Sequence, residues 1–184
     1  MTLGYLFQGI FMAKLDMAFR ADRIDATAFL APGVVILGNV TIAKFSSVWY
    51  NSVIRGDTEC ISIGSCTNIQ DGCVLHADLG IPCRLGNRVT LGHGAIVHGA
   101  EIDDDVMIGM RAVVMNSARI GSGCIIGVGA VVTESTEIPP NSVVLGIPGR
   151  VVRATTDKDR ERIAHAAEHY VEAAKAYLNN SGRV

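Results

Sequence analysis

Three of the five histidines in this sequence lie in a short central stretch, at His76, His93 and His98. Neutral imidazole nitrogens are common zinc ligands, and a site with three protein ligands keeps a fourth position open for water. A metal in such a site makes the bound water a nucleophile near neutral pH. The three histidines therefore indicate metal-assisted chemistry, provided that the fold brings them together.

Four further polar residues precede or accompany the histidines: Arg55, Asp57, Gln70 and Asp71. An arginine and a carboxylate form a strong and directional ion pair, so these residues are candidates for organising the site. Arg55 and Asp57 belong to an R-G-D tripeptide, but nothing in the sequence indicates secretion. A structural ion-pair role is therefore favoured over cell adhesion.

A six-residue period determines how these side chains lie relative to one another. Between Ile24 and Val144 an aliphatic residue recurs at every sixth position, apart from two insertions and one skipped residue. All 20 of these lead positions hold isoleucine, leucine or valine. The leads are Ile24, Leu30, Ile36, Ile42, Val48, Ile54, Ile63, Ile69, Leu75, Leu85, Leu91, Val97, Ile102, Ile108, Val114, Ile120, Ile126, Val132, Ile138 and Val144.

The residue four places after each lead is nearly always small, as at Ala28, Ala112 and Ala130. One large and one small inward residue per six-residue face predicts an all-β solenoid, a parallel β-helix of hexapeptide repeats with three faces per coil. Glycine, asparagine or aspartate often fills the intervening positions, where corners need unusual dihedral angles. An α-helix is excluded for this region, because its period is 3.6 residues.

The repeat places the candidate residues in two columns. Arg55, His76 and His98 each follow a lead of the third face directly, so they are expected to stack on consecutive coils. Asp71 and His93 each lie two places after a lead of the second face, so they form another column. Stacked coils are about 4.8 Å apart, so His76 and His98 can share one metal ion.

His93 lies on a different edge of the coil from the other two histidines. A neighbouring subunit can present its His93 to the His76–His98 pair more readily than the same chain can. Triangular β-helices commonly associate as threefold trimers. The sequence therefore predicts a homotrimer with a metal site at each subunit interface, where Arg55 faces Asp71 of the neighbour and fixes the register.

The spacing of the apolar residues changes after the repeats. From Thr156 onwards, residues such as Ile163, Ala167 and Ala174 recur at helical spacing, and Thr156 with Asp159 resembles a capping start. We expect one amphipathic helix lying along the β-helix. The predicted organisation is an N-terminal extension and lead-in at 1–23, the β-helix at 24–149, and a linker with the C-terminal helix at 150–184.

A second pair of histidines, His165 and His169, falls in this helix. The segment H-A-A-E-H matches the inverted zinc-protease pattern, but too little chain follows for the additional ligand domain. We interpret this helix face as solvated. Tyr170 is expected to pack against the β-helix, with a contact to the site as the alternative.

Composition and charge exclude several classes of partner. A net charge of −2 without basic runs argues against nucleic acid. Although the mean hydropathy is +0.33, the sequence has no apolar stretch long enough for a membrane span. Five cysteines without C-x-x-C spacing indicate reduced thiols, and no secretory signal is recognisable, so a cytoplasmic location is expected. Either Met1 or Met12 can be the start.

Three segments of the repeat resemble the γ-class carbonic anhydrases, whose β-helix is left-handed. They are W-Y-N-S-V-I-R-G-D (Trp49–Asp57), N-I-Q-D-G-C-V-L-H (Asn68–His76) and L-G-H-G-A-I-V-H-G (Leu91–Gly99). The resemblance implies reversible hydration of carbon dioxide to hydrogencarbonate by zinc-bound hydroxide at a trimer interface, with iron or cobalt as possible alternatives to zinc. It also implies a role for each matching residue. His76, His98 and the neighbour's His93 would be zinc ligands, Gln70 would position the water, and Arg55, Asp57 and Asp71 would form the polar network.

The sequence departs from the family's active archetype in the residues that export the proton. Thr58 stands where the archetype has a glutamate, and the short segment after His76 lacks the acidic loop. Glu59, Asp78 and Tyr170 are alternative routes. Two rival functions stay open: a hexapeptide acyltransferase or thioester enzyme acting on acyl-CoA, suggested by G-I-P-G-R at 146–150, and a non-catalytic trimeric metal-binding scaffold.

Overall fold

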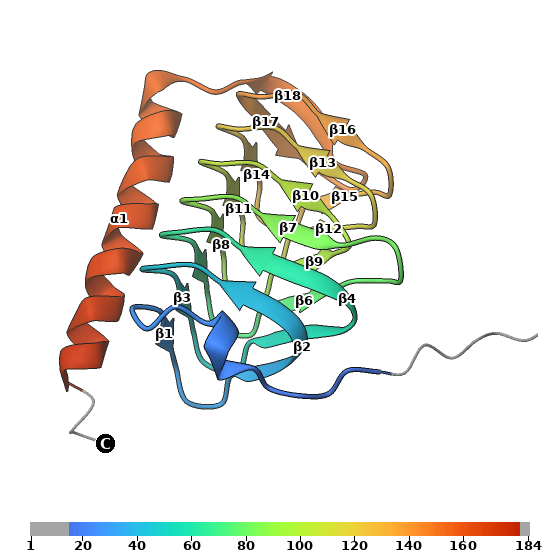
Figure 1. The fold of residues 1–184 in the computed structure, drawn as a ribbon. Helices are drawn as coiled ribbons and strands as arrows, with labels where there is room; N and C mark the ends of the chain where they lie inside the picture. Colours follow the sequence, from blue (N-terminus) through green and yellow to red (C-terminus); the bar gives the residue numbers. More distant parts are fainter. Residues whose placement is uncertain (1–14, 181–184) are drawn as a thin grey trace, which may run out of the picture.

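The computed structural model describes residues 15–180 and shows a left-handed parallel β-helix with one long helix along its side (Figure 1). The predicted fold class is confirmed. Most of the predicted N-terminal extension, including both candidate start residues, lies outside the described residues. No helix in the described range is long and apolar enough to cross a membrane.

Two sheets, whose strands are parallel except for β18, form the three faces of the coil. One sheet contains β1 (Phe29–Leu30), β3 (Ser47–Val48), β5 (Asn68–Ile69), β8 (Thr90–Leu91), β11 (Met107–Ile108), β14 (Ile125–Ile126), β17 (Ser142–Leu145) and β18 (Arg150–Ala154). The other contains β2 (Val35–Ile42), β4 (Val53–Ile63), β6 (Val74–His76), β7 (Cys83–Leu85), β9 (Ile96–His98), β10 (Glu101–Ile102), β12 (Val113–Val114), β13 (Arg119–Ile120), β15 (Val131–Val132) and β16 (Glu137–Ile138). The second sheet covers two faces because β2 and β4 continue around a corner, so that β4 pairs with β6 near its start and with β7 near its end.

The lead residues align from coil to coil as the period predicts. Leu75 pairs with Val97 and Val97 with Val114, and the other two faces show the same register. These aliphatic side chains fill the centre of the coil, and most of them are completely buried. The insertions in the repeat are taken up by the middle of β4, between Gly56 and Ile61, and by the loop between β6 and β7.

Most corners of the coil place the residue three after the lead in the left-handed region of backbone space. Glycine occupies some of these positions, such as Gly94 (φ +69°), but Arg88 (φ +54°) and Arg111 (φ +57°) occupy others. Side chains with a Cβ adopt this region at a cost of about 1–2 kcal/mol. The expected preference for glycine, asparagine and aspartate therefore holds only in part, because coil stacking imposes the conformation on other residues.

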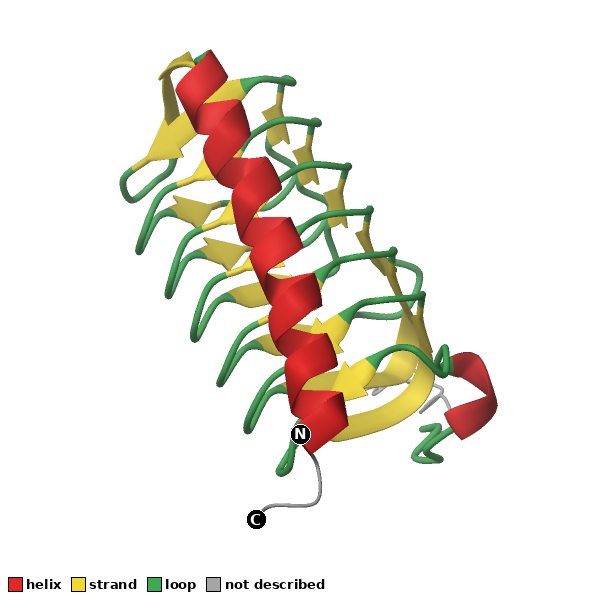
Figure 2. Ribbon diagram, turned by 90° about the vertical axis from the view of Figure 1, so that its left-hand side faces the viewer, coloured by secondary structure: helices red, strands yellow, loops and turns green. Residues whose placement is uncertain are grey.

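Helix α1 (Asp157–Asn180) runs along the sheet that begins with β1 (Figure 2). Ile163, Ala167 and Ala174 are buried, which agrees with the predicted apolar stripe. Tyr170 packs edge-on against Trp49, with ring centroids 5.4 Å apart. The predicted capping start is present, since the Thr156 amide donates to Asp159 Oδ2 at 2.8 Å.

The ends of the β-helix differ from the simple repeat. The segment expected to be a linker begins with β18, which pairs antiparallel with β17. The hexapeptide period does not predict this strand, because the strand follows the turn at Gly149 beyond the last repeat. At the other end, a short 3-10 helix, η1 (Ala21–Arg23), precedes the first coil. The Asp16 amide just before it donates to the backbone oxygen of Asp57 at 3.0 Å.

Candidate metal centre

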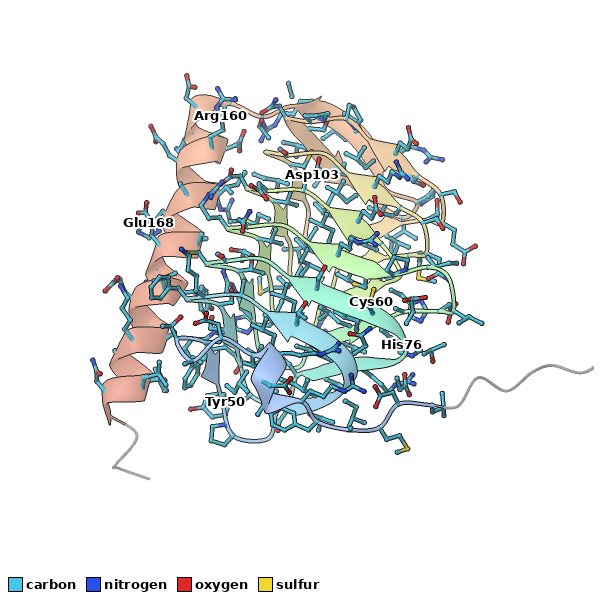
Figure 3. All side chains as sticks on the ribbon, in the orientation of Figure 1. Tyr50, Cys60, His76, Asp103, Arg160 and Glu168 are labelled. Atoms are coloured by element: carbon cyan, nitrogen blue, oxygen red, sulfur yellow. The ribbon has the colours of Figure 1, made fainter. Side chains whose placement is uncertain are left out.

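The first predicted column is present on the face formed by β4, β6 and β9. Arg55 is the register partner of His76, and His76 is the partner of His98. Both histidines follow a buried lead, so their side chains project outwards from neighbouring parallel strands. His76 lies at the edge of the β-helix away from α1 (Figure 3). Strand pairing alone therefore brings these two imidazoles together.

The two imidazole rings face each other through ring nitrogens. His76 Nδ1 lies 2.9 Å from His98 Nε2, and the ring centroids are 4.9 Å apart. The remaining ring nitrogens meet oxygen acceptors: His76 Nε2 lies 3.1 Å from Asp57 Oδ1, and His98 Nδ1 lies 2.7 Å from Asn116 Oδ1. In the neutral rings, these acceptors select the tautomers that carry hydrogen on the outer nitrogens. Two lone pairs then point at one another.

Asp57 is held in its ionised form by the same contacts. Burial raises the pKa of its carboxyl group, but hydrogen bonds from Arg55 and His76 outweigh burial, so the pKa lies below its usual value. Arg55 Nη1 donates to Asp57 Oδ2 at 2.7 Å. Arg55 thus pairs with Asp57 of its own chain, and the expected pairing with Asp71 of a neighbouring subunit stays a prediction.

A glycine allows Asn116 to reach His98. Gly99 follows His98 directly and has a φ of +53°. A Cβ on Gly99 would lie 2.4 Å from Asn116 Oδ1, which is far inside van der Waals contact. A larger residue at this position would displace the acceptor that selects the tautomer of His98.

The second predicted column lies at the next corner of the coil. The amide of Gly94, beside His93, donates to the backbone oxygen of Asp71 at 2.9 Å, which shows that the two turns stack. His93 Nδ1 lies 2.8 Å from Asp71 Oδ2. With hydrogen on Nδ1, His93 keeps the lone pair of Nε2 for another partner. About half of its side chain is exposed in the single chain.

The residues at this centre fit a zinc ion. Two ligand nitrogens on a tetrahedral zinc lie roughly 3.3 Å apart, since each bond is about 2.0–2.1 Å long. The His76–His98 nitrogen separation of 2.9 Å is close to this value. Outer hydrogen bonds to carboxylate or amide oxygens are typical of ligand histidines. Within residues 15–180, the only group of three potential ligands is His76, Asp78 and His98, and His93 of the same chain is not part of it.

Gln70 lies in the wall of a separate cavity. This cavity, of about 430 Å³, is also lined by His93 and by residues of α1 including His169 and Tyr170. Gln70 is largely buried, and its Nε2 donates to Asn68 Oδ1 at 3.2 Å. The structure therefore groups Gln70 with His93 rather than with the His76–His98 pair of the same chain.

The other candidate residues are placed as follows. His165 and His169 are exposed and stack with ring centroids 6.3 Å apart, without a third ligand in the described range. The Thr58 hydroxyl donates to Asp57 Oδ1 at 3.4 Å. Glu59 accepts hydrogen bonds from the amides of Cys60 and Gly80, which lower its pKa. Burial raises the pKa of Tyr170.

Sequence reasoning missed Asn116 and did not consider Asp78 as a potential ligand. Asn116 lies two places after lead Val114, one coil beyond Gly99, so the register of the repeat contained a usable signal. The register of the repeat could not predict the position of Asp78, because the loop that carries Asp78 interrupts the six-residue period.

The repeat register and the coiled sheets define a hexapeptide-repeat protein of the left-handed β-helix class. Residues 99–134 match the family described as bacterial transferase hexapeptide (six repeats). A hexapeptide transferase family protein from Anaplasma phagocytophilum has a similar structure, with a TM-score of 0.81 and 32% identity over 84% of this chain and 91% of that chain.

Two curated relatives narrow the class to a family. A "Probable carbonic anhydrase" of Methanocaldococcus jannaschii is 52% identical over 152 residues, which cover 83% of this chain and 96% of the relative. A carbonic anhydrase of Geobacillus kaustophilus is 40% identical over 158 residues, covering 86% and 87%. The chain belongs to the γ-class carbonic anhydrase-like family of hexapeptide-repeat proteins.

Proposed function

We propose that this protein is a zinc-dependent enzyme that hydrates carbon dioxide reversibly at the interfaces of a homotrimer. His76 and His98 of one subunit and His93 of the next would hold the metal. A zinc ion bound there would supply Lewis acidity that activates water near neutral pH. The observation that carries the proposal is shared by all three histidines: each has one ring nitrogen beside an oxygen acceptor, which leaves the other nitrogen for a metal.

The chain's own residues would orient the ligands and hold the water. Asp57, Asn116 and Asp71 each accept from one histidine, which fixes the ring orientation and raises the basicity of the ligand. Arg55 keeps Asp57 ionised through its hydrogen bond. Gln70 lines the same cavity as His93, which supports a position beside water at the interface.

The acyltransferase alternative rests on the hexapeptide repeat and on the transferases that share it. The repeat is common to both classes and by itself does not distinguish them. A transferase needs one histidine as a base, whereas here three histidines each have an oxygen acceptor. A non-catalytic scaffold would keep the metal but not turn over carbon dioxide.

Metal analysis combined with a stopped-flow hydration assay tests this function. We expect about one zinc per chain and rapid hydration, both lost in His98→Ala, because each site then keeps only two imidazoles. Stoichiometric metal without hydration, or with transfer from acetyl-CoA, would overturn the carbon dioxide proposal in favour of one of the rivals.

Mixed subunits test whether each site is shared between chains. His76→Ala and His93→Ala proteins should each be inactive, but after subunit exchange about a quarter of the interfaces should combine two intact halves. Mixing His76→Ala with His98→Ala is the matched control, since both changes affect the same half and no intact site can form. Equal activities in the two mixtures after verified exchange would exclude a site shared in this way.

A further inference from the structure

The loop between β6 and β7 carries a carboxylate beside the His76–His98 pair. Its turn is closed by the amide of Ile81, which donates to the backbone oxygen of Asp78 at 2.9 Å. Glu59 Oε2 accepts from the amide of Gly80 at 3.0 Å, which ties the loop to the middle of β4. The backbone at Asp78 is therefore fixed although the loop projects from the coil.

The side chain of Asp78 is directed towards the histidine pair by Asn116. The Asn116 Nδ2 group donates to Asp78 Oδ2 at 2.9 Å, while its Oδ1 faces His98 Nδ1 at 2.7 Å. One amide thus orients both the imidazole and the carboxylate. Asp78 Oδ1 lies 4.0 Å from His98 Nε2, the nitrogen that faces His76.

The three donor atoms are close enough to share one ion. Ligand atoms of His76, Asp78 and His98 all lie within 4.8 Å of one another. Neighbouring ligands on a tetrahedral metal are roughly 3.3 Å apart, so the Asp78 carboxylate needs to move by only about 1–2 Å. The Asp78 side chain is 53% exposed and has room for this movement. Two imidazoles with one carboxylate are a known donor set for zinc and for ferrous iron.

We propose that Asp78 completes a three-donor metal site with His76 and His98 of its own chain. One chain then binds a divalent transition metal without His93 of a neighbour, so metal loading does not require the assembled interface. His93 from a neighbouring subunit would take the place of Asp78 on assembly, since four protein ligands would close the open position that catalysis requires. This inference rests on the metal site of the proposed function, but its ligand set is different.

Metal affinity of the full chain in the His93→Ala background isolates this role of Asp78. Zinc or cobalt(II) is titrated into His93→Ala, His93→Ala with Asp78→Asn, and His93→Ala with Asp103→Asn, against a competing chelator. Asp103 lies further along the β-helix from His76 and serves as the carboxylate control (Figure 3). We expect Asp78→Asn to weaken binding at least tenfold, as for loss of a coordinating group, and Asp103→Asn to leave it unchanged.

A cysteine in place of Asp78 tests for direct coordination of the metal. A thiolate-to-metal absorption band forms only when the sulfur binds the metal, and a purely electrostatic effect does not produce one. Asp78→Cys in the His93→Ala background should give a near-ultraviolet thiolate-to-cobalt charge-transfer band, whereas Asp103→Cys should not. Equal affinities for the Asp78→Asn and Asp103→Asn proteins, or no such band for Asp78→Cys, would overturn the inference.

The hydration assay keeps the two proposals separate. A wild-type protein that binds metal but does not hydrate carbon dioxide would contradict the proposed function and leave the Asp78 result standing. Active wild-type enzyme together with an unaltered metal affinity on removal of Asp78 in the His93→Ala background would contradict only the inference.

Discussion

Asp57 is the residue whose ionisation depends most directly on the candidate centre. It accepts from Arg55 and from His76, and its side chain is only 7% exposed. A carboxylate in such a position contributes stability only while it is ionised. The stability that Asp57 contributes should therefore depend on pH.

Asp57→Asn is expected to destabilise the metal-free protein by about 2 kcal/mol at pH 6, as hydrogen bonds to a buried charge are lost. Burial raises the pKa of Asp57, but the hydrogen bonds from Arg55 and His76 outweigh burial, so the folded-state pKa lies below its usual value. This contribution is present above the unfolded pKa of about 3.9 and is lost as pH falls through the folded pKa. The measurement is denaturant unfolding with chelator between pH 6 and pH 3.

The difference between the wild type and Asp57→Asn should therefore shrink towards acid pH. Glu134→Gln, at an exposed carboxylate, is the control for the general effect of removing a negative charge. A difference that stays constant down to pH 3 would show that the ionised form of Asp57 contributes no stability.

The elements of this fold are short strands joined at regular corners, and the corners carry its backbone strain. Ser135 has a φ of +55°, although its side chain is exposed and its amide donates to the backbone oxygen of Asn116. Glycine adopts this conformation without the steric cost of a Cβ. The stacked coils hold serine there because the hydrogen bond from its amide to the previous coil requires that backbone geometry.

Ser135→Gly should raise the free energy of unfolding by about 0.5–1 kcal/mol, because relief of strain exceeds the added entropy of the unfolded chain. Glu134→Gly, at the adjacent exposed position without a positive φ, should lower it by about 0.5–1 kcal/mol. Thermal and denaturant unfolding of both variants give the comparison. A loss of stability in both would mean that the corner imposes no strain on serine.

At the scale of the whole molecule, continuous stacking encloses three of the five cysteines. Cys73, Cys83 and Cys124 are buried, and burial raises the pKa of Cys73 and of Cys83 to about 12. Cys60 and Cys66 are partly exposed. A thiol inside the coil can react only when the coils separate.

No more than two thiols per chain should therefore react quickly with an aromatic disulfide reagent at pH 8. The other three should react at the rate of unfolding, because the thiolate is the reactive form and the buried thiols stay protonated. Timed labelling with and without denaturant measures both phases. Five rapidly reacting thiols in the folded protein would contradict the enclosed core.

The sequence was sufficient for the fold because each six-residue unit repeats the same local requirement. One aliphatic lead and one small residue per face must point inwards, so the pattern itself contains the strand positions and the register. The column of Arg55, His76 and His98 follows from that register, as the observed strand pairing of these residues shows. Strand β18 could not be predicted in this way, because it pairs antiparallel outside the repeat.

By itself, the sequence determined the β-helix, the C-terminal helix and the stacking of His76 on His98, since a fixed period converts sequence distance into position. Only the tertiary structure decided which atoms face each other. It placed Asn116 between His98 and Asp78, paired Arg55 with Asp57, and brought the loop of Asp78 back to the histidines. Side-chain rotamers and a non-repeating loop govern these contacts, and neither obeys the six-residue period.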